Sequence, residues 1–309
     1  MRILRTFAEL TDDAFLAIGV FDGVHLGHQR VIGQARDDAK AAGGSAVVLT
    51  FDPHPMRVLR PDQAPLLLTS TEHELALFEQ LGVEACLLVK FDKDFSETSA
   101  EKFIEQIASC RQVCVGTRFR FGHNRTGDVR LMEKLAPHFG YRLKEIKSVL
   151  TTDGEMISST AVRQHVLAGN LDRAAAMLGR PFSILGTVEH GDHRGHALGF
   201  PTANVNPHNE VLPPDGVYAV RARLGAEPLG GVVNIGVRPT FAGTMRRLEV
   251  HIFYFDRGLY GQTVEVEFVK KLRDEQRFAS TTELAAQIAK DITAAKRLTG
   301  VDPAATVSE

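Results

Sequence analysis

Two histidines near the N-terminus are the first residues along the chain whose side-chain type and spacing indicate a chemical role. His25 and His28 end the segment Gly-Val-Phe-Asp-Gly-Val-His-Leu-Gly-His, residues 19–28. The apolar residues 15–18 before it predict a buried strand, and residues 29–42 after it have helical composition and spacing. A helix start presents unpaired N–H groups and the positive end of its dipole, which together bind anions. We therefore predict a phosphate site at this turn.

The same pair allows two other interpretations. A zinc site would need a third or fourth N, S or O ligand, and no further histidine or cysteine cluster with ligand spacing lies near residues 25–28 in the sequence. Ordinary loop histidines would explain an isolated pair. The order of strand, glycines, histidines and helix favours the phosphate site.

A second candidate is the loop at residues 115–128, which follows an apolar run and contains three arginines. Guanidinium groups fork onto phosphates, and aromatic faces stack on planar rings. We therefore predict a wall of a nucleotide site. A solvated basic loop is the alternative, but it would leave two phenylalanines exposed without cause. The side chains concerned are Arg118, Phe119, Arg120, Phe121 and Arg125.

Two further loops follow predicted strands. In residues 157–163, Ser158 or Ser159 is predicted to cap a helix, with Arg163 one turn in; capping alone explains the serines, whereas Arg163 favours a second phosphate contact. The prolines of residues 50–55 stop a strand and stiffen a loop. That loop is open to a ligand contact or to a purely structural role.

Residues 190–204 are the richest stretch of the second half. Its three evenly spaced histidines are compatible with a metal site, but a loop that covers phosphates is favoured, because side chains separated by glycines have no fixed common direction. Thr202 and Asn204 alternate in a strand-like register. Both are therefore predicted to face one Mg²⁺ ion, which prefers oxygen ligands and bridges phosphates.

Glu249 is the candidate base of the second half. It lies in an alternating stretch, on the face opposite to Leu248 and Val250. It is either an exposed carboxylate on a half-buried sheet or, if it reaches a substrate hydroxyl, a general base.

Residues 234–240 are predicted to form a turn rich in hydrogen-bonding groups. The chain has neither the P-loop nor the dinucleotide-binding glycine pattern, so a kinase here must hold ATP in another way.

Composition bounds the class of protein. A length of 309 residues favours two domains, and 44% apolar with 24% charged residues is typical of a globular protein. The net charge of −2 gives no sign of a broad basic face for nucleic acid. We see no leader and no apolar run long enough to span a membrane, so we expect a cytoplasmic protein. The three cysteines are expected to be buried fillers.

Strand and helix patterns alternate in the first half, which predicts a parallel sheet with ligands at the carboxyl ends of its strands. After about residue 180 short strands follow one another without helices, which predicts an antiparallel barrel or sandwich. We therefore place the domains at residues 1–180 and 181–309. Predicted strands are 15–18, 45–51, 84–89, 112–115, 141–146, 182–189, 216–224, 229–235, 247–255 and 263–271; predicted helices are 29–42, 71–81, 99–108, 127–135, 171–178 and 281–298.

Taken together, the motifs resemble the bacterial bifunctional riboflavin kinase and FAD synthetase family over nearly the whole chain. The first motif alone resembles the nucleotidyltransferase superfamily. The joint presence of five motifs carries the resemblance: residues 19–28, Ile-Ser-Ser-Thr at 157–160, Leu-Gly-Phe-Pro-Thr-Ala-Asn at 198–204, Asn-Ile-Gly-Val-Arg-Pro-Thr at 234–240 and Leu-Glu-Val-His at 248–251.

The resemblance implies a fold and two activities. The N-terminal domain would be a Rossmann-like nucleotidyltransferase that transfers AMP from ATP to FMN, and the C-terminal six-stranded barrel with its terminal helix would phosphorylate riboflavin. ATP, riboflavin, FMN and FAD would be its small molecules and Mg²⁺ its metal. Flavin-dependent apoenzymes would be recipients of FAD, with neither nucleic acid nor membrane as a partner.

The resemblance also implies residue roles. His25, His28 and Arg163 would neutralise ATP phosphates, Thr202 and Asn204 would hold magnesium with ATP, and Glu249 would be the base. Further ATP contacts would come from Gly19, Phe21, Asp22, Gly23, Ser159, Thr160, Gly191, Gly195 and Pro201. Flavin contacts would come from Asn124, Asn234, Gly236, Arg238, Thr240, Arg273 and Phe278. Arg118 departs from the family, which usually has Asp or Asn there, and His196 stands where arginine is common.

Two competing functions stay open on the sequence. The first domain could transfer AMP to another acceptor while the barrel merely binds flavin. Alternatively, the barrel could be an oligonucleotide-binding module, for which Arg246, Arg247, Phe253 and Tyr254 supply only a few of the interleaved basic and aromatic residues expected.

Overall fold

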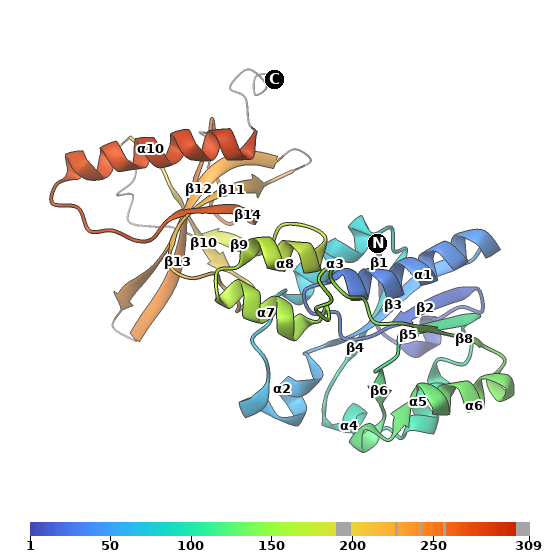
Figure 1. The fold of residues 1–309 in the computed structure, drawn as a ribbon. Helices are drawn as coiled ribbons and strands as arrows, with labels where there is room; N and C mark the ends of the chain where they lie inside the picture. The colour runs from blue at the N-terminus through green and yellow to red at the C-terminus, as the bar shows by residue number, and fades with distance from the viewer. Residues whose placement is uncertain (190–198, 226–227, 241–242, 256–257, 301–309) are drawn as a thin grey trace. The chain divides into compact units, whose positions relative to one another are not determined.

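The computed structural model describes residues 1–189, 199–225, 228–240, 243–255 and 258–300 (Figure 1). The chain folds into two compact units. One comprises Met1–Leu67 with Thr71–Ala161, and the other comprises Leu68–Ser70 with Val162–Glu309. The first unit holds a parallel sheet and the second a closed antiparallel barrel, which confirms the predicted fold class.

The sheet of the first unit has six strands, and every pairing in it is parallel. Its four central strands run mostly through buried apolar residues because helices cover both faces, whereas the two edge strands also carry charged residues. In spatial order they are β1 (Arg2–Leu4), β4 (Ala85–Lys90), β3 (Ser45–Asp52), β2 (Ala14–Ile18), β5 (Gln112–Gly116) and β8 (Arg142–Ile146).

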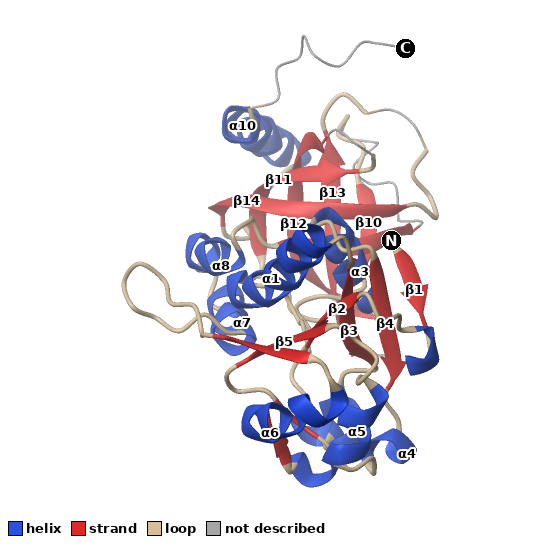
Figure 2. Cartoon of the chain, turned by 90° about the vertical axis from the view of Figure 1, so that its right-hand side faces the viewer, coloured by secondary structure: helices blue, strands red, loops and turns tan. Residues whose placement is uncertain are grey.

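Alternating residues of β2 feed two separate cores. Phe15 and Ala17 pack on the side that holds helix α1 (Leu26–Ala42) and helix α3 (Thr71–Gln80). Leu16 and Ile18 face the opposite core, which α5 (Ala100–Gln106) and α6 (Val129–Phe139) cover. Figures 1 and 2 show α1 on one side of the strands and α5 and α6 on the other. The strand at the centre of the sheet is therefore fixed from both faces.

The predicted strands and main helices of this unit are confirmed, and their ends shift for identifiable reasons. Ser99 and Asp128 are cap residues whose side chains accept the Lys102 and Leu131 N–H groups, so α5 and α6 begin one residue after each cap. The prediction missed the edge strand β1 and short elements in loops. These are η1 (Phe7–Glu9), α2 (Pro55–Leu59), η2 (Pro61–Gln63), α4 (Lys93–Ser96), β6 (Arg120–Phe121), η3 (His123–Arg125) and β7 (Gly127–Asp128).

Two helices, α7 (Ser159–Leu167) and α8 (Leu171–Leu178), precede the barrel. The Ser158 hydroxyl accepts the Ala161 N–H, as predicted for a capping serine. The division between the compact units falls inside α7, after Ala161, so α8 lies in the same unit as the barrel.

The barrel closes with six antiparallel strands, as the family resemblance implied. Residues 234–240, predicted to be a turn, instead lie in a long strand that pairs to its end with the next one, so that prediction was wrong. In spatial order the strands are β10 (Ala203–Pro207), β13 (Gly243–Ile252), β12 (Pro228–Thr240), β11 (Gly216–Arg223), β14 (Thr263–Arg273) and β9 (Ser183–Glu189).

Helix α10 (Thr281–Thr299) covers part of the outer face of the barrel. Its Ala295 is fully buried and Ile292 packs beside it, against Val217 and Ala219 of β11. These positions lie in the closing helix predicted at residues 281–298. The Ser280 hydroxyl caps its first turn by accepting the Glu283 N–H.

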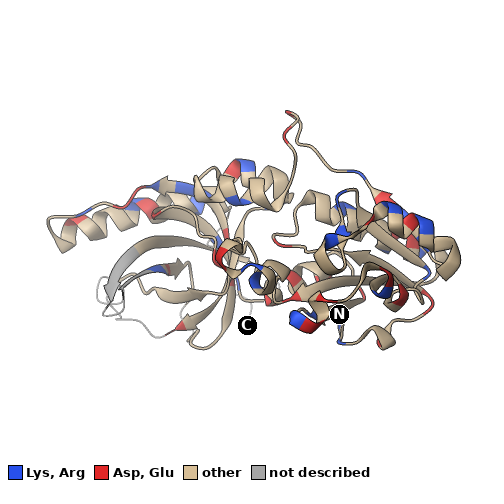
Figure 3. Ribbon diagram, turned by 90° about the horizontal axis from the view of Figure 1, so that it is seen from below, with Lys and Arg blue, Asp and Glu red and all other residues tan. Residues whose placement is uncertain are grey.

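Charged side chains of both signs are interspersed along the helices and strands of each unit (Figure 3). Across the described residues, none of the helices combines the length and the apolar character needed to cross a membrane.

Two glycines test how tightly the first unit is packed. Gly122 has a φ of +73°, and a Cβ there would lie 2.7 Å from the Ala100 backbone. We expect Gly122→Ala to destabilise the unit by roughly 2 kcal/mol, through the unfavourable backbone region and the overlap. Gly33, inside α1, has open space at its Cβ position, so Gly33→Ala should stabilise by about 0.5–1 kcal/mol.

Urea unfolding of the full chain, followed by circular dichroism, measures both glycine changes. Equal effects of the two substitutions would contradict the packing described at Gly122.

Candidate functional site

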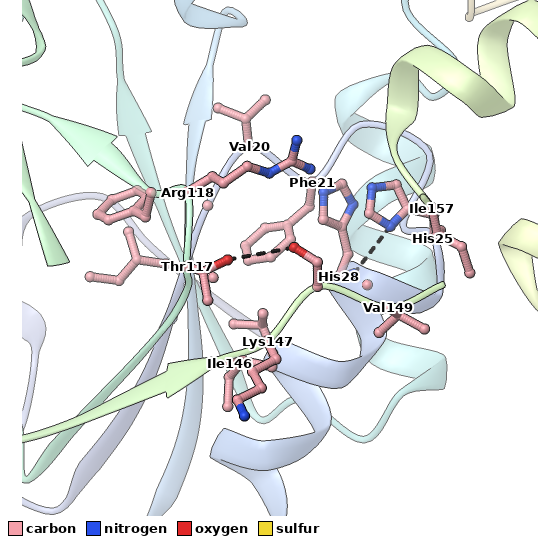
Figure 4. A pocket seen from close by; sticks show the side chains of 17 residues that line it. Val20, Phe21, His25, His28, Thr117, Arg118, Ile146, Lys147, Val149 and Ile157 are labelled. Atoms are coloured by element: carbon pink, nitrogen blue, oxygen red, sulfur yellow. Dashed lines mark hydrogen bonds between the residues drawn. The ribbon is translucent and has the colours of Figure 1, made fainter. Parts of the chain in front are cut away.

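The sheet places one pocket at its topological switch point. From β2 the chain moves to β3 on one side of it and later returns to β5 on the other. Ligands bind at the carboxyl ends of the strands at such a point. A cavity of about 250 Å³ lies there, lined by the residues that follow β2, β5 and β8 and by the start of α1 (Figure 4). Of the predicted ATP-site residues, Gly19, Phe21, His25 and His28 line it.

The two histidines are fixed against each other at the start of α1. His25 is the N-cap residue, and its Nδ1 accepts the backbone N–H of His28 at 3.2 Å. Its ring stacks on that of His28 with centroids 3.5 Å apart and an interplanar angle of 20°. Phe21 meets the His28 ring edge to face at 5.2 Å. A Cβ at Gly27 would lie 2.9 Å from the His25 ring, so this position needs glycine. The predicted pair is therefore a rigid unit facing the pocket.

The electrostatic state of the pair follows from its surroundings. Burial lowers the pKa of His28 well below its usual value, the adjacent His25 lowers it further, and a hydrogen bond with the Phe21 backbone opposes them. His28 is therefore neutral at physiological pH. Its Nδ1 atom is buried without a hydrogen-bond partner among the described residues. A buried polar atom facing a cavity is ready to bond a polar ligand.

Only some of the residues predicted to act in the loop at 115–128 line the pocket. Arg118 and Phe119 line the pocket, but Phe121 is buried and stacks on Phe119 with centroids 5.4 Å apart. The two rings therefore pack in the core rather than standing exposed. Arg120 pairs with Asp128 at 2.6 Å, and Arg125 occupies the left-handed region with a φ of +59° outside the pocket lining.

The remaining predicted residues of the adenylyl site, Asp22, Gly23, Ser159, Thr160 and Arg163, are not among the residues that line this pocket. Asp22 is buried, and its carbonyl oxygen accepts the Ser159 hydroxyl at 2.9 Å. Gly23 adopts a φ of +83° in the turn that leads to His25. The structure thus ties the start of α7 to this turn. Thr160 follows Ser159, and Arg163 lies one turn further along the helix.

Sequence reasoning missed part of the pocket. Lys147 and Ser148 follow β8 and line the cavity, where the Ser148 hydroxyl lies 3.5 Å from that of Thr117. Their position directly after a parallel strand was the available signal. The cysteines, in contrast, are as predicted: all three are buried, and burial raises the pKa of Cys86 and Cys110 to about 12 and of Cys114 to about 11. None of these thiols is poised as a nucleophile.

In the barrel, strand register brings three predicted residues into one row. Glu249 of β13 is directly opposite Asn204 of β10 and Asn234 of β12. Directly opposed residues share a face and lie within side-chain contact range. Their neighbours Leu248 and Val250 are buried inside the barrel, so this row faces outward, as predicted for Glu249.

The Thr202 side of this row is fixed by a histidine. His251 lies two residues after Glu249 on the same face, and its Nδ1 donates to the Pro201 carbonyl oxygen at 2.8 Å. Thr202 is exposed and immediately precedes β10. The hydroxyl and amide oxygens available here are of the kind that Mg²⁺ prefers, and waters and phosphates would complete its coordination shell. Among the described residues, no cluster of three or more His, Cys, Asp or Glu side chains competes for a metal.

The same row continues to two predicted flavin contacts. Asn234 is opposite Val217 of β11, which is opposite Arg273 at the end of β14. Arg273 pairs with Asp291 of α10 at 2.9 Å, and its guanidinium lies 5.7 Å from the centroid of the Phe278 ring. The structure thus brings Arg273 and Phe278 together.

Other predicted flavin and ATP contacts are placed differently. A Cβ at Gly236 would overlap the Glu275 carboxylate, so the segment after β14 packs closely there. Asn124 belongs to the first compact unit, in an exposed turn with a φ of +54°. Arg238 and Thr240 lie in β12, but their side chains are outside the described set, and Gly191 and Gly195 lie outside the described residues.

Comparisons with known proteins agree with this arrangement. The family model for FAD synthetase matches residues 8–161, and the model for riboflavin kinase matches residues 178–299. A solved structure described as a macrolide-efflux protein from Streptococcus pneumoniae superposes with a TM-score of 0.82 at 28% identity, over 96% of this chain and 99% of that chain.

Curated relatives match over the full length. The bifunctional riboflavin kinase/FMN adenylyltransferase of Escherichia coli (strain K12) is 39% identical over 97% of this chain and 99% of its own. The protein of the same name from Bacillus subtilis (strain 168) is 39% identical over 89% of each chain. The chain therefore belongs to the bifunctional riboflavin kinase/FMN adenylyltransferase family, and it phosphorylates riboflavin to FMN with ATP and then transfers AMP from ATP to FMN, giving FAD and pyrophosphate.

Proposed function

We propose that the two reactions occur at two separate sites: the pocket at the start of α1 for AMP transfer, and the outer face of the barrel around Glu249 for riboflavin phosphorylation. The observation that supports this assignment is that each site has its own group of polar side chains, which come from different helices and strands. The histidine pair lies at the switch point of the sheet. The row of Asn204, Glu249 and Asn234 is built by barrel register.

In the adenylyl step, an FMN phosphate oxygen attacks the α-phosphorus of ATP, the bond to the bridging oxygen breaks, and pyrophosphate leaves. His25, whose Nδ1 accepts the His28 backbone N–H, donates from Nε2 to the phosphates beside the N–H groups of α1. His28 contacts them through its open Nδ1, which takes up a proton when the phosphate anion binds. The Ser159 bond to the Asp22 carbonyl supports the assignment of Ser159, Thr160 and Arg163 to the same site, because it holds the turn before His25. Positioning and charge neutralisation supply the catalysis, so no covalent nucleophile is required.

In the kinase step, the primary hydroxyl of riboflavin attacks the γ-phosphorus of ATP and ADP leaves. Glu249 accepts the hydroxyl proton. Asn234, Gly236, Arg273 and Phe278 orient the flavin from the same outer face, with Arg238 and Thr240 further along β12. The Arg273 and Asp291 pair supports this, because it fixes the flavin-facing end of β14 to α10.

Thr202 and Asn204 would hold Mg²⁺ with ATP at the kinase site, and Gly191, Gly195 and Pro201 would belong to the loop over its phosphates. The ion supplies charge neutralisation on the phosphates when it is bound.

We assign residues 1–180 to AMP transfer and residues 181–309 to the kinase, although the compact units divide within α7. We further propose that the reactions take place in the cytoplasm and that flavin-dependent apoenzymes receive the FAD. Incubation with riboflavin, ATP and magnesium, followed by separation of the flavins, tests the two-step assignment.

His28→Ala is expected to lower FAD formation from FMN about 100-fold or more, because it removes a preorganised imidazole from the phosphate site. FMN formation from riboflavin should be unchanged. His138→Ala, which removes an exposed histidine of α6, is the matched control and should leave both rates intact. Equal loss of both activities in His28→Ala would show that the sites are wrongly assigned.

Glu249→Gln is expected to have the opposite effect. The amide cannot accept the hydroxyl proton, so riboflavin phosphorylation should fall about 100-fold or more while AMP transfer to supplied FMN continues. Steady-state assay of each half-reaction gives the result. Wild-type kinase turnover in this variant would remove Glu249 from the base role.

Removal of divalent metal with EDTA should abolish FMN formation, and added Mg²⁺ should restore it. Asn204→Ala should raise the Mg²⁺ concentration needed for half-maximal kinase rate, because one oxygen ligand is lost. A titration of rate against Mg²⁺ measures this shift. An unchanged midpoint in Asn204→Ala would argue against Asn204 as part of the metal site.

A further inference from the structure

The charge of the adenylyl pocket is carried by very few side chains. Of the residues that line it, taken from the part of the chain that the structure describes, none is a carboxylate, and only Arg118 and Lys147 are permanently cationic. The His28 imidazole is neutral, because burial keeps its pKa well below the usual value. In the free protein His28 therefore supplies no positive charge, and the phosphates need their charge balanced from elsewhere.

Arg118 is the cation of this loop that remains available. Arg120 is engaged by Asp128 at 2.6 Å, and Arg125 lies outside the pocket lining. Arg118 forms no ion pair with any carboxylate of the described residues, and its side chain is exposed. Figure 4 shows its guanidinium directed toward the two imidazole rings, whereas the Lys147 amine is directed away from them.

The backbone that carries Arg118 is held on both sides. The Thr117 N–H donates to the Ile146 carbonyl oxygen at 3.1 Å, and the Phe119 N–H donates to the Gly116 carbonyl oxygen at 2.9 Å. The Phe119 ring is further fixed by stacking on buried Phe121. The backbone at this strand end is therefore already ordered, and only the Arg118 side chain has to be ordered when it binds.

From this geometry we propose that Arg118 is a phosphate-binding residue of the adenylyl site. Its guanidinium binds a phosphate group from the side opposite to the His25 and His28 rings. The inference rests on the proposed function of that pocket. A guanidinium fork matches two phosphate oxygens, and the histidines with the α1 N–H groups meet the others. The phosphate comes either from the triphosphate of ATP or from FMN, and both are present in the reaction.

The test compares Arg118→Ala and Arg118→Lys with the wild-type full-length enzyme. Arg130→Ala is the matched control, because Arg130 is exposed on α6, outside the pocket lining, and its loss changes the net charge equally. AMP transfer is measured with ATP and FMN varied separately, and with pyrophosphate varied in the reverse direction. We expect Arg118→Ala to lower kcat/KM about 10- to 100-fold and Arg118→Lys to recover part of the loss, because lysine keeps the charge without the fork.

The substrate that responds identifies the phosphate. A change confined to ATP and pyrophosphate supports a triphosphate contact, and a change confined to FMN supports a contact with its phosphate; either result supports the proposal. Rates for Arg118→Ala within about twofold of wild type, or no lower than those of Arg130→Ala, would overturn it. His28→Ala is assayed in parallel: if it loses AMP transfer while Arg118→Ala does not, only the Arg118 role fails, and if neither variant is affected, the assignment of the pocket itself fails.

Discussion

The start of helix α1 is the constraint on which the adenylyl site depends. His25 caps the helix through its own ring and thereby holds that ring parallel to His28, so one hydrogen bond fixes both imidazoles. Gly27 leaves room for this stack. Burial keeps the His28 ring neutral. The site is therefore a set of oriented polar groups around a helix end, with no charge on His28 to repel its neighbour when no phosphate is bound.

The barrel reaches a comparable result by a different route. Antiparallel register, rather than a helix start, aligns Asn204, Glu249 and Asn234 across three strands. The interior residues Leu248 and Val250 set which side of β13 faces out. Shifting the register of β13 by one residue would turn Glu249 inward, so the packing of the barrel interior specifies the position of the carboxylate. The core and the proposed kinase site are in this sense one arrangement.

The sequence predicted the elements well, because strand and helix periodicity reflects burial within each element. The strand predicted at residues 15–18 and the helix predicted at residues 281–298, which buries Ala295, are examples. It failed where long-range pairing decides. Residues 234–240 carry turn-forming letters, yet pairing with β13 draws them into a strand. The position of Lys147 after a strand is visible in the sequence, but the residue lines the pocket because β8 lies beside β5, and no local pattern encodes that neighbour.

The aromatic residues of the 115–128 loop also show that a functional role depends on packing that the local sequence does not determine. Phe119 and Phe121 were predicted as part of the wall of a nucleotide site. Phe119 lines the pocket, whereas Phe121 is buried, and the two rings stack on each other and support the loop that carries Arg118. The family resemblance assigned roles to motif residues and left the departure at Arg118 without one. The pocket geometry gives that departure a physical meaning, because it adds a cation where no carboxylate lines the cavity in the described chain.

The most direct measurement of the central claim is nitrogen NMR of the His28 ring in the full-length protein, titrated with pH and then with ATP and magnesium. The account predicts a ring that stays neutral well below pH 6.5 in the free protein, since burial depresses its pKa, and a ring resonance that moves when ATP is added. A His28 ring that titrates at the ordinary value of about 6.5 and is unchanged by ATP would contradict it.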